Sequence, residues 1–272
     1  MKARNLRALL GALALPTSAV CFAAAPQYAV VDLGAAYVAG SGLTWQSRQS
    51  KPAPANWPSS GGSQCFGPVA PYIEAQYGNV AVGATCEPDY GNQAAKWTVA
   101  SDGTVTLTDL GRLPGAGGDV NGPYSAAYDF NNVGDIVGVS QSNAEQNHAG
   151  CPCVALHGFI YNNGTWTDLV PIAGPAYESI AYAVNDSHEV VGVTDTISST
   201  TGEVLNRAFV YIGGTMYNLT FYLVGGPTVL LSSALWIDCQ GNIAAVGTPA
   251  AGGTTHNYLL VRQGAARTNC PK

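Results

Sequence analysis

The chain has 272 residues, of which 47% are hydrophobic and only 10% are charged, with 33 glycines and 16 prolines. This length and composition suit one large all-β domain with a sizeable buried core. The formal net charge of −6 argues against nucleic acid or an anionic membrane as a partner, because both select proteins with a basic face.

The N-terminus, residues 1–25, predicts a secretory signal peptide. Three basic residues precede an apolar run from Ala8 to Val20, and alanines follow. The run is too short to span a bilayer, and cleavage is expected between residues 23 and 25 because Pro26 disfavours a cut directly before it. Cys21 leaves a lipid anchor as an alternative, although Val20 is a poor residue before a lipidated cysteine. The sequence therefore predicts a secreted or periplasmic protein without membrane insertion.

The mature region, residues 26–272, contains one unit four times. The glycines that end the second strand of each unit are 55, 54 and 55 residues apart: Gly83, Gly138, Gly192 and Gly247. This spacing is too long for one coil of a β-helix and close to one four-stranded propeller blade. We therefore expect a single β-propeller domain with repeats at about 70–120, 121–176, 177–228 and 229–263.

Each repeat begins with two strands joined by a tight turn rich in Asn, Asp and Gly, which tolerate the positive φ of such turns. These hairpins are expected at 73–82, 126–139, 180–193 and 235–246. Third strands are expected at 94–97, 157–161, 207–211 and 256–260, and fourth strands at 107–111, 166–169 and 216–219. The turns lack the several carboxylates that a calcium loop needs, so we interpret them as structural.

The fourth repeat lacks its last strand, and a matching segment stands at the other end of the chain. Residues 28–34 repeat the Asp-Leu pattern of the other fourth strands, and the long loop 35–70 follows them. We expect this segment to pair with the last blade, leaving no open sheet edge, and the tail 264–272 to follow that blade. The predicted fold is thus a four-bladed β-propeller of four-stranded antiparallel blades, closed by the N-terminal strand.

The units share the pattern Ser-x-Ala-Tyr-x-x-Asn-Asp-x-x-x-Val-Val-Gly, then His/Arg-Ala-Phe, then Asp-Leu-Gly. This pattern resembles the bacterial extracellular HAF repeat over nearly the whole mature chain, most closely in the second and third units. The first unit departs from it with Gln93-Ala94-Ala95, and the fourth with His256-Asn257-Tyr258. Members of that family are exported and lack an established common activity, so the resemblance implies fold and location rather than chemistry.

In such a propeller the tight hairpin turns share one face and the long connections share the other. Variable loops on a rigid scaffold commonly carry binding sites, so we expect any ligand at the long-loop face. The longest loop contains Trp45 and Trp57, which could stack on a sugar ring or an aromatic ligand. The alternative is that both tryptophans pack the loop onto the blades.

Six cysteines remain after the signal peptide, and an even number in an exported chain predicts disulfides. The loop layout favours two bonds, Cys65–Cys86 in the first blade and Cys239–Cys270 in the last. The remaining pair, Cys151 and Cys153, could close a short ring, bond between chains or stay reduced. With His148 close by, this pair also permits a soft-metal site, which an oxidising compartment disfavours.

One polar residue opens the third strand of each repeat: Gln93, His157, Arg207 and His256. These positions lie too far from the axis to share one ion, and hydrogen bonding to a neighbouring loop or blade is the simpler role. Candidate ligand-binding residues are therefore Trp45, Trp57, His157, Arg207 and His256. The fourth strands carry a matching series that we interpret as accepting backbone N–H groups, because Asn replaces Asp in it: Asp32, Asp109, Asp168 and Asn218.

The sequence contains no Gly-x-Ser-x-Gly elbow, His-Glu-x-x-His motif, P-loop or dinucleotide fingerprint. No catalytic residue, metal ligand or cofactor is therefore predicted. The leading hypothesis is a non-catalytic, monomeric binding module that recognises a glycan, a peptide or a surface protein through the long-loop face. The alternatives are an extracellular polysaccharide hydrolase or lyase with an acidic pair in that cleft, and a structural or adhesive repeat protein.

Overall fold

The computed structural model describes residues 25–34, 51–52, 56–58, 72–87, 91–116, 124–145, 153–265 and 267. Nearly all of the predicted signal peptide lies outside these ranges, as does Trp45. The described residues form β-strands and one short 3-10 helix without any α-helix, which confirms the all-β class. Within these ranges no helix has the length and apolarity needed to cross a membrane.

The strands form four antiparallel sheets. The first contains β2 (Lys51–Pro52), β3 (Tyr72–Tyr77), β4 (Val80–Glu87), β5 (Gly91–Val99) and β6 (Val105–Gly111). The second contains β7 (Ser125–Phe130), β8 (Ile136–Glu145), β9 (Val154–Asn162) and β10 (Thr165–Leu169). The third contains β11 (Ser179–Val184), β12 (Val190–Ile197), β13 (Val204–Ile212) and β14 (Thr215–Asn218), followed by the 3-10 helix η1 (Leu219–Tyr222). The fourth contains β15 (Val229–Ile237), β16 (Ile243–Pro249), β17 (His256–Arg262) and β1 (Tyr28–Asp32).

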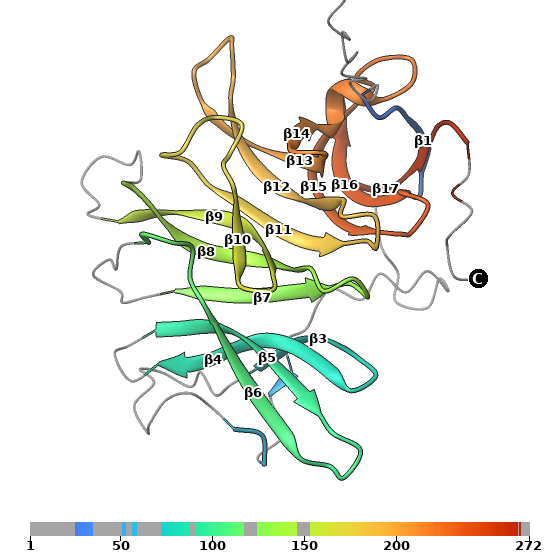
Figure 1. Cartoon of the computed structure of the whole chain (residues 1–272). Helices are drawn as coiled ribbons and strands as arrows, with labels where there is room; N and C mark the ends of the chain where they lie inside the picture. The colour runs from blue at the N-terminus through green and yellow to red at the C-terminus, as the bar shows by residue number, and fades with distance from the viewer. Residues whose placement is uncertain are drawn as a thin grey trace, which may run out of the picture.

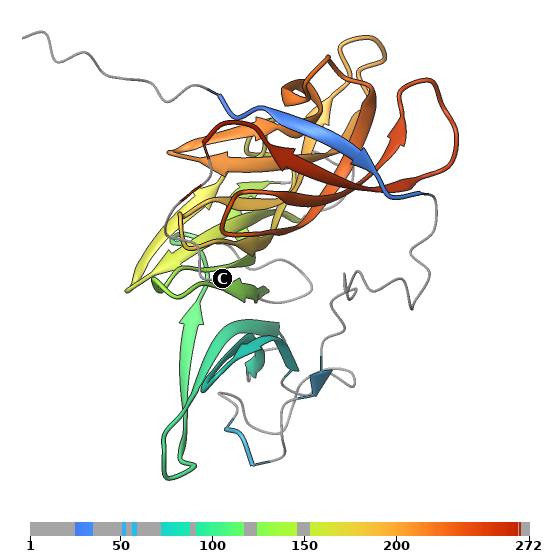
Figure 2. The same cartoon turned by 90° about the vertical axis from the view of Figure 1, so that its right-hand side faces the viewer.

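The N-terminal strand completes the fourth sheet, as the repeat pattern predicts. β1 pairs antiparallel with β17 along its whole length, from Tyr28 opposite Arg262 to Asp32 opposite Tyr258 (Figure 2). Tyr28 is fully buried, and its carbonyl accepts a 2.8 Å hydrogen bond from the amide of Val224, beyond η1. β1 is thus hydrogen-bonded to β17 along one edge and to the segment after η1 at Tyr28. Contact between the first and fourth sheets, which a closed four-bladed ring requires, stays a prediction.

The four sheets follow one another in chain order, and each packs face to face on the next (Figure 1). β7 contacts β11 and β11 contacts β15, so the first strands of successive repeats lie together. The three cores between the sheets are built from alternate residues of each strand, and examples in chain order are Val82 with Phe159, Val137 with Phe209, and Val210 with Leu260. Burial of these alternating side chains holds the stack together.

A β-bulge interrupts the first strand of every repeat at one equivalent position. The extra residue follows Ile73, Ala127, Ala181 and Ala234, so the bulged residues are Glu74, Tyr128, Tyr182 and Leu235. A bulge bends its strand and increases the local twist. The bulge is therefore part of the repeated unit rather than a local irregularity.

The repeated glycine lies opposite this bulge in the first three repeats, where the neighbouring strand approaches too closely for a side chain. A Cβ at Gly138 would lie 2.0 Å from the carbonyl oxygen of Ala126, and one at Gly192 would lie 1.9 Å from that of Ile180. The sequence alignment is wrong in the fourth repeat, where the register places Ala245 at the equivalent position. Gly247 instead lies beside a second bulge, between Leu231 and Ser233, which has no counterpart among the described residues of the other repeats.

The hairpin turns connect the second sheet to the third, and the third to the fourth, through their first residue. The side chain of Asn131 accepts bonds from the amides of Val133 and Asp135 and donates a 2.9 Å bond to the carbonyl of Asn185. Asn185 repeats the arrangement and donates a 2.9 Å bond to the carbonyl of Asp238. These turns show the predicted positive φ at Gly134, His188 and Gly241. Asparagine at this position therefore serves its own turn and the neighbouring repeat together.

Candidate functional site

The histidines of the third strands form hydrogen bonds with neighbouring residues of the protein. His157 is 1% exposed, and its Nδ1 and Nε2 lie 2.8 Å from Asp168 Oδ1 and from the carbonyl oxygen of Pro175. His256 Nδ1 lies 2.8 Å from Asp32 Oδ2 at a more exposed position. Each pair joins the third strand of a sheet to its fourth strand. This geometry favours the structural role over ligand binding, since His157 offers no ring nitrogen to solvent.

Arg207 does not join these histidines. Its guanidinium Nη1 donates a 2.8 Å hydrogen bond to the carbonyl of the adjacent Asn206, and partial burial lowers the pKa of the side chain. His157, Arg207 and His256 thus bond within their own sheets or to the next loop. The structure does not bring the candidate third-strand residues together around one ligand.

Trp57 packs residues 56–58 onto the outer face of the first sheet. Its ring centroid lies 5.9 Å from that of Trp97, and Trp97 Nε1 donates a 3.0 Å bond to the carbonyl of Pro58. Ile73, Ala81 and Ala95 complete this small core. Trp57 stays half-buried and therefore presents part of its indole to the surface.

The exposed part of Trp57 lines an open depression of about 650 Å³. The β3–β4 and β5–β6 turns also line the depression and contribute Gln76, Asn79 and Ser101. The described lining residues carry amide, hydroxyl and apolar groups and no charge. This depression lies at the tight-turn end of the first sheet, whereas the sequence predicted ligand binding at the long-loop end.

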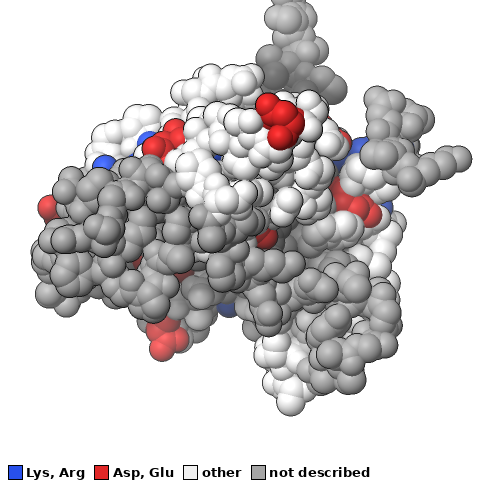
Figure 3. Space-filling view, turned by 90° about the horizontal axis from the view of Figure 1, so that it is seen from below, with Lys and Arg blue, Asp and Glu red and all other residues white. Residues whose placement is uncertain are grey.

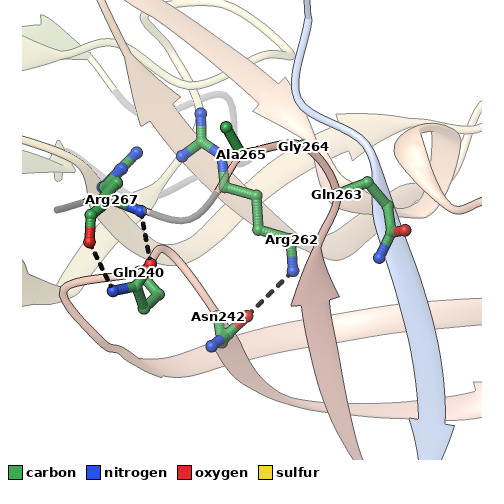
Figure 4. Close-up of a pocket in the computed structure, with 7 residues that line it drawn as sticks. All are labelled: Gln240, Asn242, Arg262, Gln263, Gly264, Ala265 and Arg267. Atoms are coloured by element: carbon green, nitrogen blue, oxygen red, sulfur yellow. Dashed lines mark hydrogen bonds between the residues drawn. The ribbon is translucent and has the colours of Figure 1, made fainter.

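A second depression, of about 480 Å³, lies at the tight-turn end of the fourth sheet (Figure 4). The side chain of Gln240 accepts a 2.8 Å hydrogen bond from the backbone amide of Arg267 and donates a 3.0 Å bond to its carbonyl. The side chain of Asn242 accepts a hydrogen bond from the backbone amide of Arg262. The carboxylate of Glu189, from the third sheet, accepts hydrogen bonds from the guanidinium groups of Arg262 and Arg267, including a 2.8 Å bond from Arg267 Nη1. This cluster joins the C-terminal residues to the third sheet.

Glu189 is only 2% exposed. Burial alone would raise the pKa of its carboxyl group, but hydrogen bonds from Arg267, Asn185 and Arg262 outweigh burial and hold the pKa below the ordinary value of 4.5. Because both guanidinium groups are engaged by Glu189, we interpret this cluster as structural.

Charged side chains are few on the surface. On the face in Figure 3, acidic groups stand apart from one another and little basic surface is visible, in line with the net charge of −6. Within the described ranges, no group of three or more His, Cys, Asp or Glu side chains could hold a metal ion.

The predicted disulfides fall largely outside the described residues. Cys65, Cys151 and Cys270 are not described, and neither is the side chain of Cys86. The pairings therefore stay predictions.

Sequence reasoning missed two clusters. The bulged Tyr128 and Tyr182 stack with ring centroids 6.0 Å apart, and burial raises the pKa of the Tyr128 hydroxyl. An Ala-Tyr pair at the same place in two repeats was the available signal. The contact between Glu189 and Arg267 had no signal, because these residues are far apart in the chain and Arg267 lies in the tail that follows the last repeat.

Comparisons with known proteins give no identification. No family model, curated protein or solved structure matches the chain. The resemblance to HAF repeats stays a prediction.

Proposed function

We propose that the protein is a secreted, non-catalytic binding module that recognises a glycan at the depression beside Trp57. The four sheets act as propeller-type blades in this proposal, an arrangement supported by their order in the stack and by the pairing of β1 with β17. The observation that carries the proposal is a half-exposed tryptophan fixed at the wall of an uncharged depression.

The chemistry of the depression favours a neutral sugar. An indole ring offers a flat apolar surface to the C–H face of a pyranose, while amide and hydroxyl groups bond to the sugar hydroxyls. Gln76, Asn79 and Ser101 supply such groups from two tight turns. Trp97 holds Trp57 from behind, so little side-chain entropy is lost when a ligand stacks on the indole.

The test is an array of neutral oligosaccharides, followed by calorimetric titration of the strongest binder. Removal of a central aromatic contact commonly costs more than 1 kcal/mol, so Trp57→Ala is expected to weaken binding about tenfold or more. Asn79→Ala should weaken binding to a smaller extent without changing the first sheet. Ser199→Ala, at an exposed loop position of the third sheet, serves as the control and should bind like the parent protein.

Two outcomes contradict the proposal. One is the absence of binding to every sugar on the array. The other is equal affinity for the parent, Trp57→Ala and Asn79→Ala proteins at matched thermal stability, which would place the ligand elsewhere.

A further inference from the structure

The depression of about 480 Å³ at the tight-turn end of the fourth sheet brings two arginines together (Figure 4). The side chains of Arg262 and Arg267 both line this pocket and are 24% and 25% exposed. None of the other described lining residues is acidic. On a chain with a net charge of −6, a lining that contains two cations and no anion favours a negatively charged ligand.

Arg262 keeps part of its hydrogen-bonding capacity. Its Nη1 donates to Oε1 of Glu189. Among the described residues, neither Nε nor Nη2 of Arg262 has a hydrogen-bond acceptor. The N–H groups of Nε and Nη2 lie along one edge of the planar guanidinium group and point in the same direction, which is the arrangement that binds both oxygens of one carboxylate. The ion pair with Glu189 thus leaves the bidentate edge of Arg262 to a ligand.

The guanidinium group of Arg262 is fixed in position before any ligand binds. Glu189 accepts the Nη1 bond from one side, and Gly241 of the β15–β16 turn lies close by. A Cβ at Gly241 would lie 2.9 Å from both Cδ and Nη1 of Arg262, so the side chain lies directly against this turn. An arginine that is already ordered loses little rotamer entropy when it binds a ligand.

The carboxylates near the pocket limit the charge of the ligand. Glu189 balances one of the two guanidinium groups. Asp238 is close to Arg267, and its carboxylate oxygens accept bonds of 2.8 Å from the backbone and side-chain nitrogens of Asn242. The pocket therefore suits a single carboxylate better than a highly charged anion.

Amide groups extend the pocket beyond Arg262. Nε2 of Gln263 donates a 2.9 Å bond to the carbonyl of Val261, and Oε1 of Gln263 accepts no hydrogen bond within the described part of the chain. A free amide oxygen binds a hydroxyl group. A volume of about 480 Å³ lies in the range of small-molecule sites. A ligand with one carboxylate and several hydroxyls, as in a sugar acid, matches both groups.

Residues 268–272 follow Arg267 and are the competing occupant. Their sequence, Thr-Asn-Cys-Pro-Lys, contains no acidic side chain. Both backbone groups of Arg267 are bonded to the side chain of Gln240, which fixes the point where this segment begins. The segment therefore supplies no side-chain carboxylate to the free edge of Arg262.

We propose that this pocket binds the carboxylate of a sugar acid of the hexuronate class. Nε and Nη2 of Arg262 donate to the two carboxylate oxygens, and Oε1 of Gln263 accepts a bond from a hydroxyl of the sugar. The pocket belongs to the fourth sheet, whereas the depression beside Trp57 belongs to the first. The proposal therefore does not depend on the binding of a neutral glycan at Trp57.

Titration of the protein with sodium glucuronate, followed by nuclear magnetic resonance, tests the proposal. Glucuronate should shift the Nε–H signal of Arg262 in a saturable way, whereas glucose, and sodium chloride at equal ionic strength, should not. Arg262→Lys keeps a cation beside Glu189 but lacks the two parallel N–H groups, so its affinity should fall about tenfold or more. Arg207→Lys, outside the pocket, is the matched control and should bind like the parent protein.

Thermal melting shows whether each variant is folded, and only folded variants are compared. Gln263→Ala should weaken the binding of glucuronate but not that of acetate, which has no hydroxyl group. A parent protein without a saturable response to glucuronate overturns the proposal. Equal affinity of the parent and the folded Arg262→Lys protein also overturns it, because the carboxylate would then bind without the bidentate edge. If Arg262→Lys does not fold, Gln263→Ala decides the question, and unchanged affinity for glucuronate in that variant contradicts the assignment.

Discussion

The second and fourth sheets place a histidine at the same position and surround it differently. His157 of the second sheet, which lies between the first and third sheets, is 1% exposed, whereas the side chain of His256 in the fourth is 23% exposed. Each bonds to an aspartate of its sheet's last strand, Asp168 or Asp32, although Asp32 comes from the other end of the chain. The repeated sequence pattern therefore determines which aspartate the histidine contacts, and the position of its sheet in the stack determines how deeply the histidine is buried.

This difference predicts that equivalent substitutions have unequal effects. Inner sheets are covered on both faces and joined to neighbours through their turns. Among the described residues, the fourth sheet packs mainly against the third. A contact should contribute most where it connects two sheets and least where it lies at the surface of the last one.

The largest effect is expected where the third sheet meets the fourth. Glu189→Ala leaves two arginines without their carboxylate partner, and breaking a buried ion pair commonly costs about 3–5 kcal/mol. Urea unfolding should show a lower midpoint for this variant. Glu203→Gln, which removes an exposed carboxylate of the third sheet, should unfold like the parent; an equal loss in both variants would contradict the structural role of Glu189.

The same carboxylate makes the fold sensitive to acid. The pKa of Glu189 is lower in the folded chain than its ordinary value of 4.5, so its contribution is fully present above pH 4.5. This contribution is lost as the pH falls through the folded-state pKa. The free energy of unfolding should decline less steeply with acidification in Glu189→Gln than in the parent. Parallel declines would show that other groups carry the acid sensitivity.

The next effect compares the glycine position in the third and fourth repeats. Gly192→Ala forces a methyl group against the carbonyl of Ile180 and should cost about 3 kcal/mol, near the upper end for overpacking. The reverse change in the fourth repeat, Ala245→Gly, should cost only about 0.5–1 kcal/mol through added chain entropy. Thermal melts of both variants provide the measurement. Equal shifts in melting temperature would contradict the inference that the neighbouring strand lies closer at Gly192 than at Ala245.

A smaller effect separates the two histidines. His157→Ala leaves buried hydrogen-bonding groups unsatisfied, which commonly costs about 1–3 kcal/mol. His256→Ala should leave the melting temperature unchanged within error, because water can replace the ring beside the exposed Asp32. A larger loss from His256→Ala would reverse the comparison.

Sequence reasoning could predict the regular parts of this molecule. Tight turns, alternating apolar residues and the Asp-Leu pattern carried local information, so the strands and the pairing of β1 with β17 were predictable. The alignment of Gly247 failed because an extra bulge after Leu231 shifted the fourth repeat, and a bulge of this kind has no composition signal. The contact of Trp57 with Trp97 and the ion pairs of Glu189 depend on how sheets and loops meet in space.

Amide hydrogen exchange across β1 tests most directly the claim that one repeated unit builds all four sheets. The β1 amides that face β17 should exchange as slowly as the β10 amides that face β9, because both strands close a sheet in the same way. Exchange of the β1 amides at the rate of an unstructured peptide, while β10 stays protected, would contradict the account.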